Sequence, residues 1–327
     1  IGALPKQMGN PDLKWQRTLN NNFGLTAAFL DSRFNLSFDF YSNTTYDMLM
    51  SVNLPPSVGT TSMNVNFGQL NNKGLDLSLS AQIIRNKDWF WSLTLTGGHV
   101  MDQIRKISQG LKNDIDNPYD SSKPKILFVE GGSQYDIYAM RSAGIDPATG
   151  KEIFIKKNGE YTFNYDEKER VAVGNTNPIL QGSLMNTLRY KGFSISVATS
   201  YTFGSDYFNS TLKNKVENID LNYNVDRRVF TDRWKEPGDH TRFLGIGTSS
   251  SSSQYSERFV EKRNELYISS IQVMYDFAPK AITRLGLRKL AIGFGLSDIA
   301  HISTVKFERG TDYPYCRGIN LIFRPTF

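Results

Sequence analysis

The sequence is built from pairs of short segments in which apolar and polar residues alternate. Between Thr18 and Phe29 the apolar side chains lie at odd positions, and after a tight turn at 31–33 they lie at even positions as far as Phe40. A period of two places successive side chains on opposite faces of a β-strand, so each segment predicts a strand with one apolar and one polar face. Such a chain is restricted to all-β folds in which the two faces of a sheet meet different surroundings.

The same pairing recurs along the chain and predicts nine strands in all. Three further hairpins are expected, followed by one last strand that ends on Phe327. The segment 180–190 is the least regular of these, because Met185 and Arg189 interrupt its alternation. The predicted partners are 75–83 with 89–96, 180–190 with 193–203, and 265–277 with 290–299, and the last strand lies near 315–327.

Connections between the predicted strands alternate in length. Short turns are expected at 31–33, 85–88, 191–192 and 278–288, and long loops near 47–63, 108–178, 204–258 and 301–313. Outer-membrane β-barrels have short periplasmic turns and long extracellular loops, whereas a soluble sandwich has no reason to keep this order. The chain also lacks any run of about 18 apolar residues, the length of a transmembrane helix. These features predict a transmembrane antiparallel β-barrel in the outer membrane of a Gram-negative bacterium.

Aromatic residues make up 13% of the chain and gather near the expected strand ends. Amphipathic rings favour the headgroup level of a membrane, so two girdles are expected, one at each end of the strands. The girdle beside the short turns is expected to contain Trp89, Phe90, Trp91, Tyr190, Phe193, Tyr275 and Phe277, and the girdle beside the long loops Phe40, Tyr41, Tyr201, Phe203 and Tyr313. The alternative is a soluble sandwich whose aromatic residues fill a core.

Nine strands leave the predicted barrel open. Bacterial single-chain barrels use an even number of strands, and an unpaired edge in lipid would leave backbone groups unsatisfied at a cost of several kcal/mol each. The segment from Ile1 to Pro5 also shows neither the charged region nor the apolar core of a signal peptide. We therefore expect additional strands upstream in a longer chain, with strands from another chain as the alternative.

Composition argues against several other classes of function. The net charge of +6 comes from Lys and Arg scattered among loops and turns, so no nucleic-acid partner is expected. Cys316 is the sole cysteine, which excludes a disulfide framework. The three histidines, His99, His240 and His301, are isolated in sequence, and no hydrolase or metalloprotease motif is present. The chain is therefore not expected to be an enzyme or to bind a cofactor.

The loop near 204–258 contains four carboxylates, but their spacing is not that of a calcium-binding EF-hand, and no metal is expected there. The segment TDRWKEPGD within this loop is expected to be structural, with a turn at Pro237-Gly238 and with Trp234 packed against the loop. The four carboxylates are Asp226, Asp232, Glu236 and Asp239.

A series of motifs runs in order through almost the whole chain. It begins with NPDLKWQRT, RFNLSFDFYSNTTYDMLM and NFGQLNNKGLDLSLSAQIIRNKDWFWSLTLTGG, continues with AGIDPATGKEIF, VGNTNPILQGSLMNTLRYKGFSIS, TDRWKEPGD and RFVEKRNELYISSIQVMYDF, and closes with YPYCRGINLIF. This series resembles the SusC/RagA family of TonB-dependent outer-membrane transporters from Bacteroidota. Gln16 and Asp76 stand where that family usually has Glu, and YDIYAMRS departs from the family's pattern.

The resemblance implies that residues 1–327 form the C-terminal part of a barrel of about 22 strands around a plug. It places the plug domain and the segment that engages TonB in an N-terminal region outside this chain. The implied function is TonB-dependent import of a glycan or an oligopeptide beneath a SusD-like lipoprotein lid, in contact with outer-membrane lipid and lipopolysaccharide. One alternative is a SusC-like barrel that serves as a structural or secretion-associated subunit of a larger envelope complex. A passive porin and a barrel enzyme are the others.

Two of the long loops are expected to carry the function. The loop near 108–178 is too long for a plain connection and contains hairpin signals at 146–150 and Asn158-Gly159, so we expect it to fold over the barrel mouth. Aromatic side chains stack on sugars and anchor protein interfaces. On that basis the candidate ligand or lid contacts are Tyr135, Tyr138, Tyr207 and Trp234.

The final residue, Phe327, has two interpretations. A terminal aromatic residue on the last strand resembles the signal that is read by the barrel-assembly machinery. The same residue also fits an aromatic girdle at the membrane surface. Both roles are compatible, and the loss of Phe327 is expected to lower the yield of folded barrel.

Overall fold

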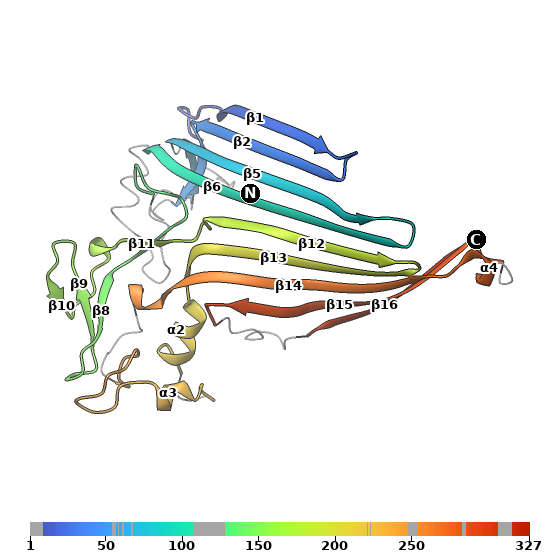
Figure 1. Ribbon diagram of the computed structural model, residues 1–327. Coiled ribbons are helices and arrows are strands. Elements are labelled where there is room, and N and C mark those ends of the chain that lie inside the picture. The colour runs from blue at the N-terminus through green and yellow to red at the C-terminus, as the bar shows by residue number, and fades with distance from the viewer. Residues whose placement is uncertain are drawn as a thin grey trace, which may run out of the picture.

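The computed structural model describes residues 9–53, 57, 59–60, 62–66, 68–107, 128–220, 222, 224–247, 254–282, 286–306 and 316–327. Its body is one antiparallel sheet of nine strands joined in sequence order (Figure 1). All nine strands predicted from the alternation are therefore present. Across the sheet they are β1 (Arg17–Phe29), β2 (Phe34–Tyr46), β5 (Gly68–Arg85), β6 (Trp89–Ile107), β12 (Leu180–Tyr190), β13 (Phe193–Phe208), β14 (Val260–Asp276), β15 (Lys289–Ser303) and β16 (Gly318–Thr326).

Smaller elements fold from the long connections. The short strands are β3 (Leu49–Asn53), β4 (Ser62–Asn66), β7 (Asp136–Ala139), β8 (Arg141–Ile145), β9 (Glu152–Ile155), β10 (Tyr161–Thr162) and β11 (Val171–Asn175). The helical turns are η2 (Glu167–Glu169), α2 (Ser210–Val216), α3 (Arg228–Thr231), η3 (Glu257–Phe259) and α4 (Pro279–Ile282). Within the described ranges, no helix has the length and apolar character needed to cross a membrane.

The two faces of the large sheet differ in polarity, as the alternation predicts. One row of aligned residues runs from Phe23 on β1 through Phe40 on β2 to Leu75 on β5, and each of these side chains is more than two-fifths exposed. We call the face that carries this row the outward face. The opposite, inward face carries Asp39 and Asp76, which lie directly opposite each other. An exposed apolar face suits lipid, so the soluble sandwich is not the fold that forms.

Several strands are longer than the sequence predicted. β5 begins at Gly68 rather than near 75, and β6 continues to Ile107 rather than ending near 96. The added part of β5 contains Asn71, Asn72 and Lys73 in succession, so both faces are polar there and no period of two is visible. The hydrogen-bonded ladder nevertheless continues through these residues. A strand that leaves the hydrocarbon loses its alternation before it loses its pairing.

Left-handed backbone conformations and local hydrogen bonds define the short turns. Leu30, Asp31 and Ser32 all have left-handed φ angles of 52–59°, and the Arg33 N–H donates to the Leu30 carbonyl at 3.1 Å. In the next turn, the side-chain oxygen of Asn86 accepts hydrogen bonds from backbone N–H groups two and three residues on, which is the usual role of Asn in turns. The connection predicted as a plain turn at 278–288 differs, because it contains the short helix α4.

The aromatic girdle predicted beside the short turns is present as a continuous row, except that Phe90 pairs with Arg189 and lies on the inward face. In register, Trp89 pairs with Tyr190, Tyr190 with Phe193, and Phe193 with Tyr275. Ring centroids are 4.2 Å apart between Trp89 and Tyr190 and 4.5 Å apart between Phe193 and Tyr275. The girdle predicted beside the long loops differs at one position, because Tyr41 lies on the inward face and its ring covers a glycine of β5. Tyr313 lies outside the described residues.

Glycines allow Tyr201 to lie flat on the outward face. Gly97, Gly182 and Tyr201 are aligned on β6, β12 and β13, and the Tyr201 hydroxyl reaches across both glycines to donate to the Thr96 carbonyl at 2.7 Å. A Cβ atom at position 182 would overlap that carbonyl oxygen. The close approach of β6, β12 and the Tyr201 ring therefore depends on the absence of a side chain at Gly182.

Gly182→Ala is expected to destabilise the folded sheet by about 1–3 kcal/mol, the usual cost of overpacking. The measurement is the fraction of compact, heat-modifiable protein on gels at increasing urea concentration. Gly295→Ala is the matched control, because its Cβ atom would make only an ordinary contact, 3.7 Å from the Cβ atom of Asn320. An equal loss of folded protein in both variants would contradict the packing argument.

Candidate functional site

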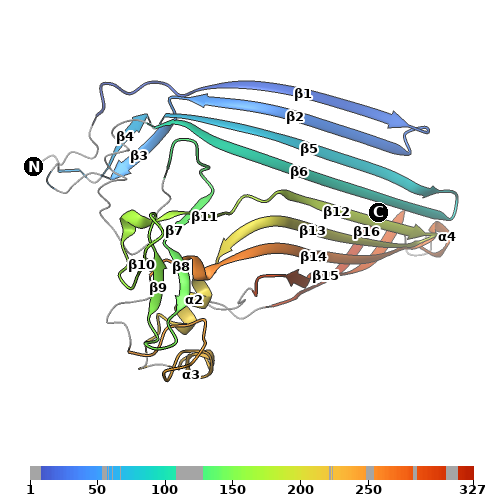
Figure 2. The same ribbon diagram turned by 60° about the vertical axis from the view of Figure 1, so that its left-hand side comes forward.

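The long loops that follow β6 and β13 fold together at one end of the sheet. Both ribbon views show β7 to β11 grouped with α2 and α3 beyond the same strand ends (Figures 1 and 2). We call the described parts of these loops, residues 128–178, 209–220, 222, 224–247 and 254–259, the cap. The cap lies at the end of the sheet that carries the long connections, which is the extracellular end of an outer-membrane barrel.

The first part of the cap is attached to the inward face of β6. The backbone N–H of Gln134 donates to the carboxylate of Asp102 at 2.7 Å, and the side chain of Ser133 also donates to Asp102. Next to this contact, Ile104 exchanges backbone hydrogen bonds with Gly131 and Gly132 at 2.8 and 2.9 Å. Asp102 belongs to the same face as Asp39 and Asp76, so the cap starts on the polar side of the sheet. This placement is what a loop that folds over the barrel mouth requires.

Both hairpins that the sequence predicted in this loop are observed. β8 and β9 are joined through the turn at 146–150, and β9 and β10 through the turn that contains Asn158 and Gly159. Asp146 closes the first turn, because its carboxylate accepts hydrogen bonds from the Ala148 N–H at 3.1 Å and from the Thr149 hydroxyl at 2.5 Å. In such an Asx turn the side chain bonds to residues only two or three positions away, so the sequence alone is enough to predict the turn.

Trp234 joins the second long loop to this first turn. Its indole ring lies over Gly150, where any Cβ atom would overlap the ring, and its indole N–H donates to the Pro147 carbonyl at 2.9 Å. The same carbonyl accepts a hydrogen bond from the Gly238 N–H at 2.9 Å. Glycine is required at position 150 for two reasons, its φ of 67° and the contact with the ring. Trp234 therefore has a packing role in the cap.

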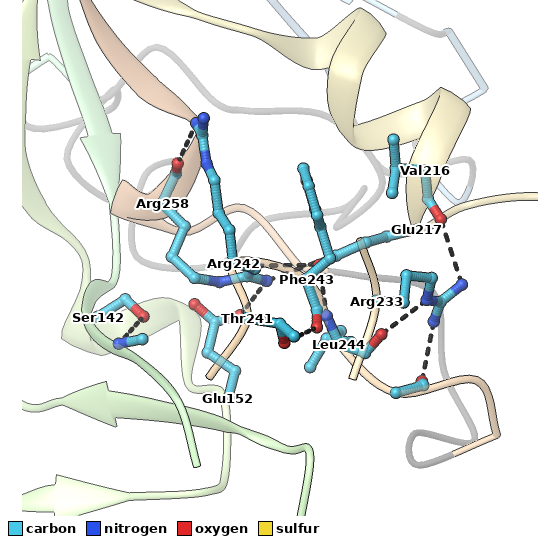
Figure 3. Close-up of polar contacts among 12 residues, drawn as sticks. Ser142, Glu152, Val216, Glu217, Arg233, Thr241, Arg242, Phe243, Leu244 and Arg258 are labelled. Atoms are coloured by element: carbon cyan, nitrogen blue, oxygen red, sulfur yellow. Dashed lines mark hydrogen bonds and ion pairs between the residues drawn. The ribbon is translucent and has the colours of Figure 1, made fainter. Parts of the chain in front are cut away.

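At the centre of the cap, one arginine binds two glutamates away from solvent (Figure 3). Arg258 donates to Glu152 at 2.8 Å and to Glu217 at 2.9 Å, and the three side chains are no more than 6% exposed. Glu152 comes from β9 in the first long loop, and Glu217 caps the end of α2 in the second. This buried triad therefore connects three segments that are far apart in sequence.

The protonation of Arg258 is secured by the same contacts. Burial alone would lower the pKa of Arg258, but hydrogen bonds from its guanidinium to Glu152 and the charges of Glu152 and Glu217 outweigh burial and raise the pKa. The cation is therefore present at every pH at which the protein folds. Removing one member of such a buried group leaves an uncompensated charge, which usually costs about 3–5 kcal/mol.

A second buried arginine holds the backbone of the same region. The guanidinium of Arg233 donates to three carbonyl oxygens, those of Leu244 at 2.6 Å, Gly245 at 2.8 Å and Val216 at 3.2 Å. Burial lowers the pKa of Arg233, and the nearby charge of Glu217 opposes that effect. Arg233 thereby supplies hydrogen bonds to three buried backbone carbonyl groups, which is how an irregular loop can be buried.

Apolar packing surrounds these charges. Leu212, Val216, Phe243 and Phe259 form a small buried cluster, with Phe208 of β13 packed against it. Beside the cluster, the ammonium group of Lys213 lies 3.9 Å from the ring centroid of Tyr255. Burial lowers the pKa of Lys213, and the facing ring partly replaces the lost water by a cation–π contact. The cap thus has a core of its own, separate from the lipid-facing surface of the sheet.

The cap is also fixed to the extracellular end of β13. The Asp206 carboxylate accepts a hydrogen bond from the Asn175 N–H at 2.9 Å, and it packs directly against Gly174 of β11. Lys262 of β14 forms an ion pair with Asp206 at 2.7 Å. Together with the contact at Asp102, this attaches the cap to both β6 and β13, and an ion pair between Arg242 and Glu261 at 2.7 Å attaches it to β14.

The four aromatic residues predicted as contacts occupy three separate places. Tyr135 lies just before β7 and is 43% exposed, while Tyr138 lies within β7 and is only 8% exposed. Tyr207 is half-buried near the end of β13. Trp234 lies over the turn at 146–150. Of these rings, Tyr135 offers the most surface to a ligand or a partner protein.

Other residues that determine the cap were not found from sequence. Glu152, Arg233 and Arg258 each lie in one of the segments that resemble the family, AGIDPATGKEIF, TDRWKEPGD and RFVEKRNELYISSIQVMYDF, and Glu217 lies outside them. Arg258 is 41 residues from Glu217 and 106 residues from Glu152, so no local signal indicates that these side chains meet.

Three of the four carboxylates predicted in the second loop, those of Asp226, Asp232 and Asp239, have hydrogen-bond or ion-pair partners within the protein. Asp226 forms a two-pronged ion pair with Arg228 at 2.7 and 2.9 Å, which lowers the pKa of Asp226. The backbone N–H groups of Lys235 and Glu236 donate to Asp239 and lower its pKa. Across the part of the chain that the structure describes, no group of three or more such side chains is arranged to hold a metal ion.

Comparison with known proteins gives consistent matches. A protein-family model described as "TonB dependent receptor-like, beta-barrel" matches residues 2–218. The chain is 26% identical to TonB-dependent receptor P39 of Formosa agariphila over 91% of this chain and 33% of that protein. It is also 26% identical to TonB-dependent receptor SusC of Bacteroides thetaiotaomicron, over 82% of this chain and 27% of that protein.

Among solved structures, the chain is similar to the structure of the RagAB peptide transporter. The TM-score is 0.78 at 24% sequence identity, and the match covers 92% of this chain and 33% of that chain. This likeness confirms the fold predicted from the strand pattern. The chain thus spans about a third or less of the length of the relatives that it matches.

Arg258→Met is expected to loosen the cap by about 3–5 kcal/mol, because Glu152 and Glu217 would be left as buried charges without a cation. Hydrogen–deuterium exchange on the intact protein should show faster exchange in α2 and β9 and unchanged exchange in β5 and β6. Combining Arg258→Met with Glu152→Leu and Glu217→Gln should restore much of the protection.

The control for this experiment is Lys156→Met, which removes an ion pair elsewhere in the cap. The Lys156–Glu160 pair is 38% and 63% exposed, so its loss should cost no more than about 1 kcal/mol. If Lys156→Met and Arg258→Met accelerated exchange in the cap equally, the buried triad would not be what stabilises it.

Proposed function

This chain belongs to the TonB dependent receptor-like β-barrel family, whose members lie in the outer membrane and are receptors rather than enzymes; from this premise we propose that the complete protein imports a large nutrient with energy delivered by TonB. The observation that carries the proposal is the folded cap. A passive pore needs no buried ion triad and no separate core in its loops. A surface that must recognise a ligand or a partner does need such rigid support.

We propose that the ligand is an oligopeptide or a glycan and that a SusD-like lipoprotein closes over the cap. The name of the similar RagAB structure, a peptide transporter, supports an oligopeptide. The resemblance to the SusC/RagA family supports both the lipoprotein partner and the use of TonB. The cap would then supply contacts on the extracellular side, and the outward face of the sheet would sit in outer-membrane lipid.

Exposed rings on the cap are the proposed contacts. Tyr135 is 43% exposed, and its backbone is held on both sides by hydrogen bonds to Ser133 and Thr176. A ring on a fixed backbone loses little entropy on binding, which makes it a good anchor. Tyr207 and Trp234 are further proposed contacts, whereas the ring of Tyr138 is only 8% exposed and offers little surface to a partner. For Trp234, only the surface not used against Gly150 is available.

An uptake experiment tests the proposed function. Cells that carry or lack the full-length protein are given fluorescent oligopeptides or fluorescent oligosaccharides, with TonB present or deleted. The proposal requires that one of the two probe classes enters only when both the protein and TonB are present. Entry without TonB would indicate a passive pore. Entry of neither probe, with stable association of the barrel with other envelope proteins, would favour the structural or secretion-associated role.

Removing the outer part of the cap is expected to weaken recognition without harming the barrel. Ala139 on β7 lies directly opposite Val171 on β11, so Asn-Gly, a favoured two-residue hairpin turn, can replace residues 140–170. The variant should insert into the membrane normally. Its affinity for the ligand or the lipoprotein should fall by about 2 kcal/mol or more, about thirtyfold in Kd, because the deletion removes Pro147 and Gly150, which hold the Trp234 ring in place.

Two point variants refine this prediction. Tyr135→Ala removes an exposed ring and should weaken uptake or lipoprotein binding, whereas Tyr138→Phe changes a ring that is only 8% exposed and should leave both unchanged. Normal uptake and normal lipoprotein binding by the variant lacking residues 140–170 would contradict a role of the cap in recognition.

The last residue is proposed to act during assembly of the barrel. Phe327 follows β16 directly and is 80% exposed, so it is available to an assembly factor. Deleting Phe327 is expected to lower the amount of folded protein in outer membranes several-fold. Phe323→Leu is the control, because it changes a 63% exposed ring on the same strand and keeps the terminal residue. An unchanged yield after deletion would leave Phe327 with a girdle role alone.

A further inference from the structure

The inward wall formed by β2, β5, β6 and β12 carries carboxylates toward one end and cations at the other. Toward the extracellular end, Asp39 and Asp76 lie directly opposite each other on β2 and β5. Beside the short turns, Arg85 and Arg189 are both aligned with Phe90 of β6, one from each side. The wall is therefore charged in opposite senses along the axis of the barrel.

The acidic end contains a recess in the wall. A cavity of about 320 Å³ is lined by Asp39, Asp76, Ser78 and Thr96, among other residues. Asp76 lies over Gly98, where a Cβ atom would overlap a carboxylate oxygen. Like charges directly opposite each other on neighbouring strands repel, and a bound cation would remove that repulsion. The recess therefore suits an ammonium group and has room for the chain that carries it.

The basic end is built around an aromatic ring. The guanidinium of Arg189 lies 5.1 Å from the centroid of the Phe90 ring, a cation–π contact that holds it against the wall. Arg85 is the register partner of Phe90 on the other side. Between Asp76 and the short turns, no described inward position of β5, β6 or β12 carries a carboxylate. Both guanidinium groups can therefore receive a carboxylate from a ligand, for which their fork of N–H donors is well shaped.

Charges on the remaining strands leave this arrangement intact. On β14 and β15, Glu265 is bound by His301 and Arg263 lies two residues further out, so this part of the wall has no acidic excess. At the short-turn end the inward charges of β14, β15 and β16 are Asp276, Lys289 and Arg324. Cations therefore predominate at that end on both sides of β13.

Between the two ends, the wall of β5, β6 and β12 is uncharged and carries hydroxyl groups. The hydroxyls of Thr96 and Ser183 are 2.8 Å apart across β6 and β12, and the Thr94 hydroxyl donates to that of Ser80 at 3.4 Å. Small hydroxyls that already bond one another hold a passing polar chain weakly at many places, and weak contacts at many sites favour release as well as entry. The charged ends therefore decide how a ligand is oriented on this wall.

The separation of the two ends corresponds to a short peptide. Gln181 of β12 lies in the row of Asp76, since both pair with Gly98, and Arg189 is eight residues further along β12. Eight residues of an antiparallel strand span about 27 Å, which is the length of an extended peptide of about eight residues. An unmodified peptide has an ammonium group at one end and a carboxylate at the other, whereas a neutral glycan has neither.

We propose that this wall orients an unmodified oligopeptide, with its amino terminus at the recess beside Asp39 and Asp76 and its carboxylate toward Arg85 and Arg189. The inference rests on the proposed import function and narrows its ligand to peptides with two free ends. Charge complementarity at both ends of the wall carries it, and the uncharged middle lets the peptide move on. The carboxyl terminus of the peptide would thus be the end nearer the periplasm.

The first arm of the test leaves the protein unchanged. Cells with the full-length protein and TonB are given octapeptides with uncharged side chains and a neutral fluorophore on a central residue. The four forms have free ends, an acetylated amino terminus, an amidated carboxyl terminus, or both modifications. Each modification is expected to lower the rate of entry at least about tenfold, the lower end of what a charge focused in a cleft contributes. Equal rates for all four forms would overturn the proposal.

Fluorescent oligosaccharides in the same cells separate this inference from the proposed import. TonB-dependent entry of oligosaccharides but of no peptide would overturn the inference and leave the proposed import standing. Entry of neither class of probe would remove both.

The second arm assigns each effect to one end of the wall. In the variant with Arg85→Gln and Arg189→Gln, amidation should no longer slow entry, whereas acetylation still should. In the variant with Asp39→Asn and Asp76→Asn, acetylation should no longer slow entry, whereas amidation still should.

The matched control is the variant with Lys87→Gln and Lys191→Gln. It removes two cations from the short turns at the same end of the sheet, outside the inward positions of the strands, and both effects should remain. Persistence of both effects in both wall variants would overturn the proposal. Loss of the amidation effect in the control as well would also overturn it, because the net charge of that end would then be enough.

Discussion

Backbone hydrogen bonding within the membrane is the constraint on which the rest of this structure depends. The hydrocarbon core offers no water to an unpaired N–H or C=O group, so strands that cross it must pair on both sides. The chain meets this requirement with a simple meander in which each strand of the sheet pairs with the next one. β1 and β16 are the two edges of the nine-stranded sheet, where a closed barrel requires further pairing.

Pairing in register aligns the side chains of neighbouring strands, and this alignment separates apolar from acidic side chains on the two faces of the sheet. Rings and aliphatic side chains collect on the outward face, whereas Asp39, Asp76 and Asp102 collect on the inward face. The cap then uses the inward face as its base through Asp102. A shift of one residue in any strand would exchange these faces, so the register determines both the membrane contact and the position of the cap.

The sequence predicts those parts of the structure whose causes are local. Alternation located all nine strands, and the Asx turn at Asp146 and the pair Asn158-Gly159 located the cap hairpins. The extension of β5 was missed because Asn71, Asn72 and Lys73 make both faces polar there, and that of β6 because its apolar residues Val100, Met101, Ile104 and Ile107 do not alternate. The Arg258 triad could not be predicted, since its partners are 41 and 106 residues away and only the folded loops bring them together. Exposure likewise cannot be read from a loop sequence: Tyr135 and Tyr138 looked equivalent, yet only Tyr135 is well exposed.

The central claim is that one face of the sheet meets lipid and the other does not, and β1 allows a direct test. After Cys316→Ser, single cysteines are placed at positions 22, 23, 24 and 25 of the full-length protein in membranes, and each is given a spin label. Accessibility to oxygen, which concentrates in lipid, should be high at Phe23 and Leu25, and accessibility to a water-soluble nickel complex should be higher at Asn22 and Gly24. Equal accessibility at all four positions, or the opposite alternation, would contradict the assignment of the faces and the account built on it.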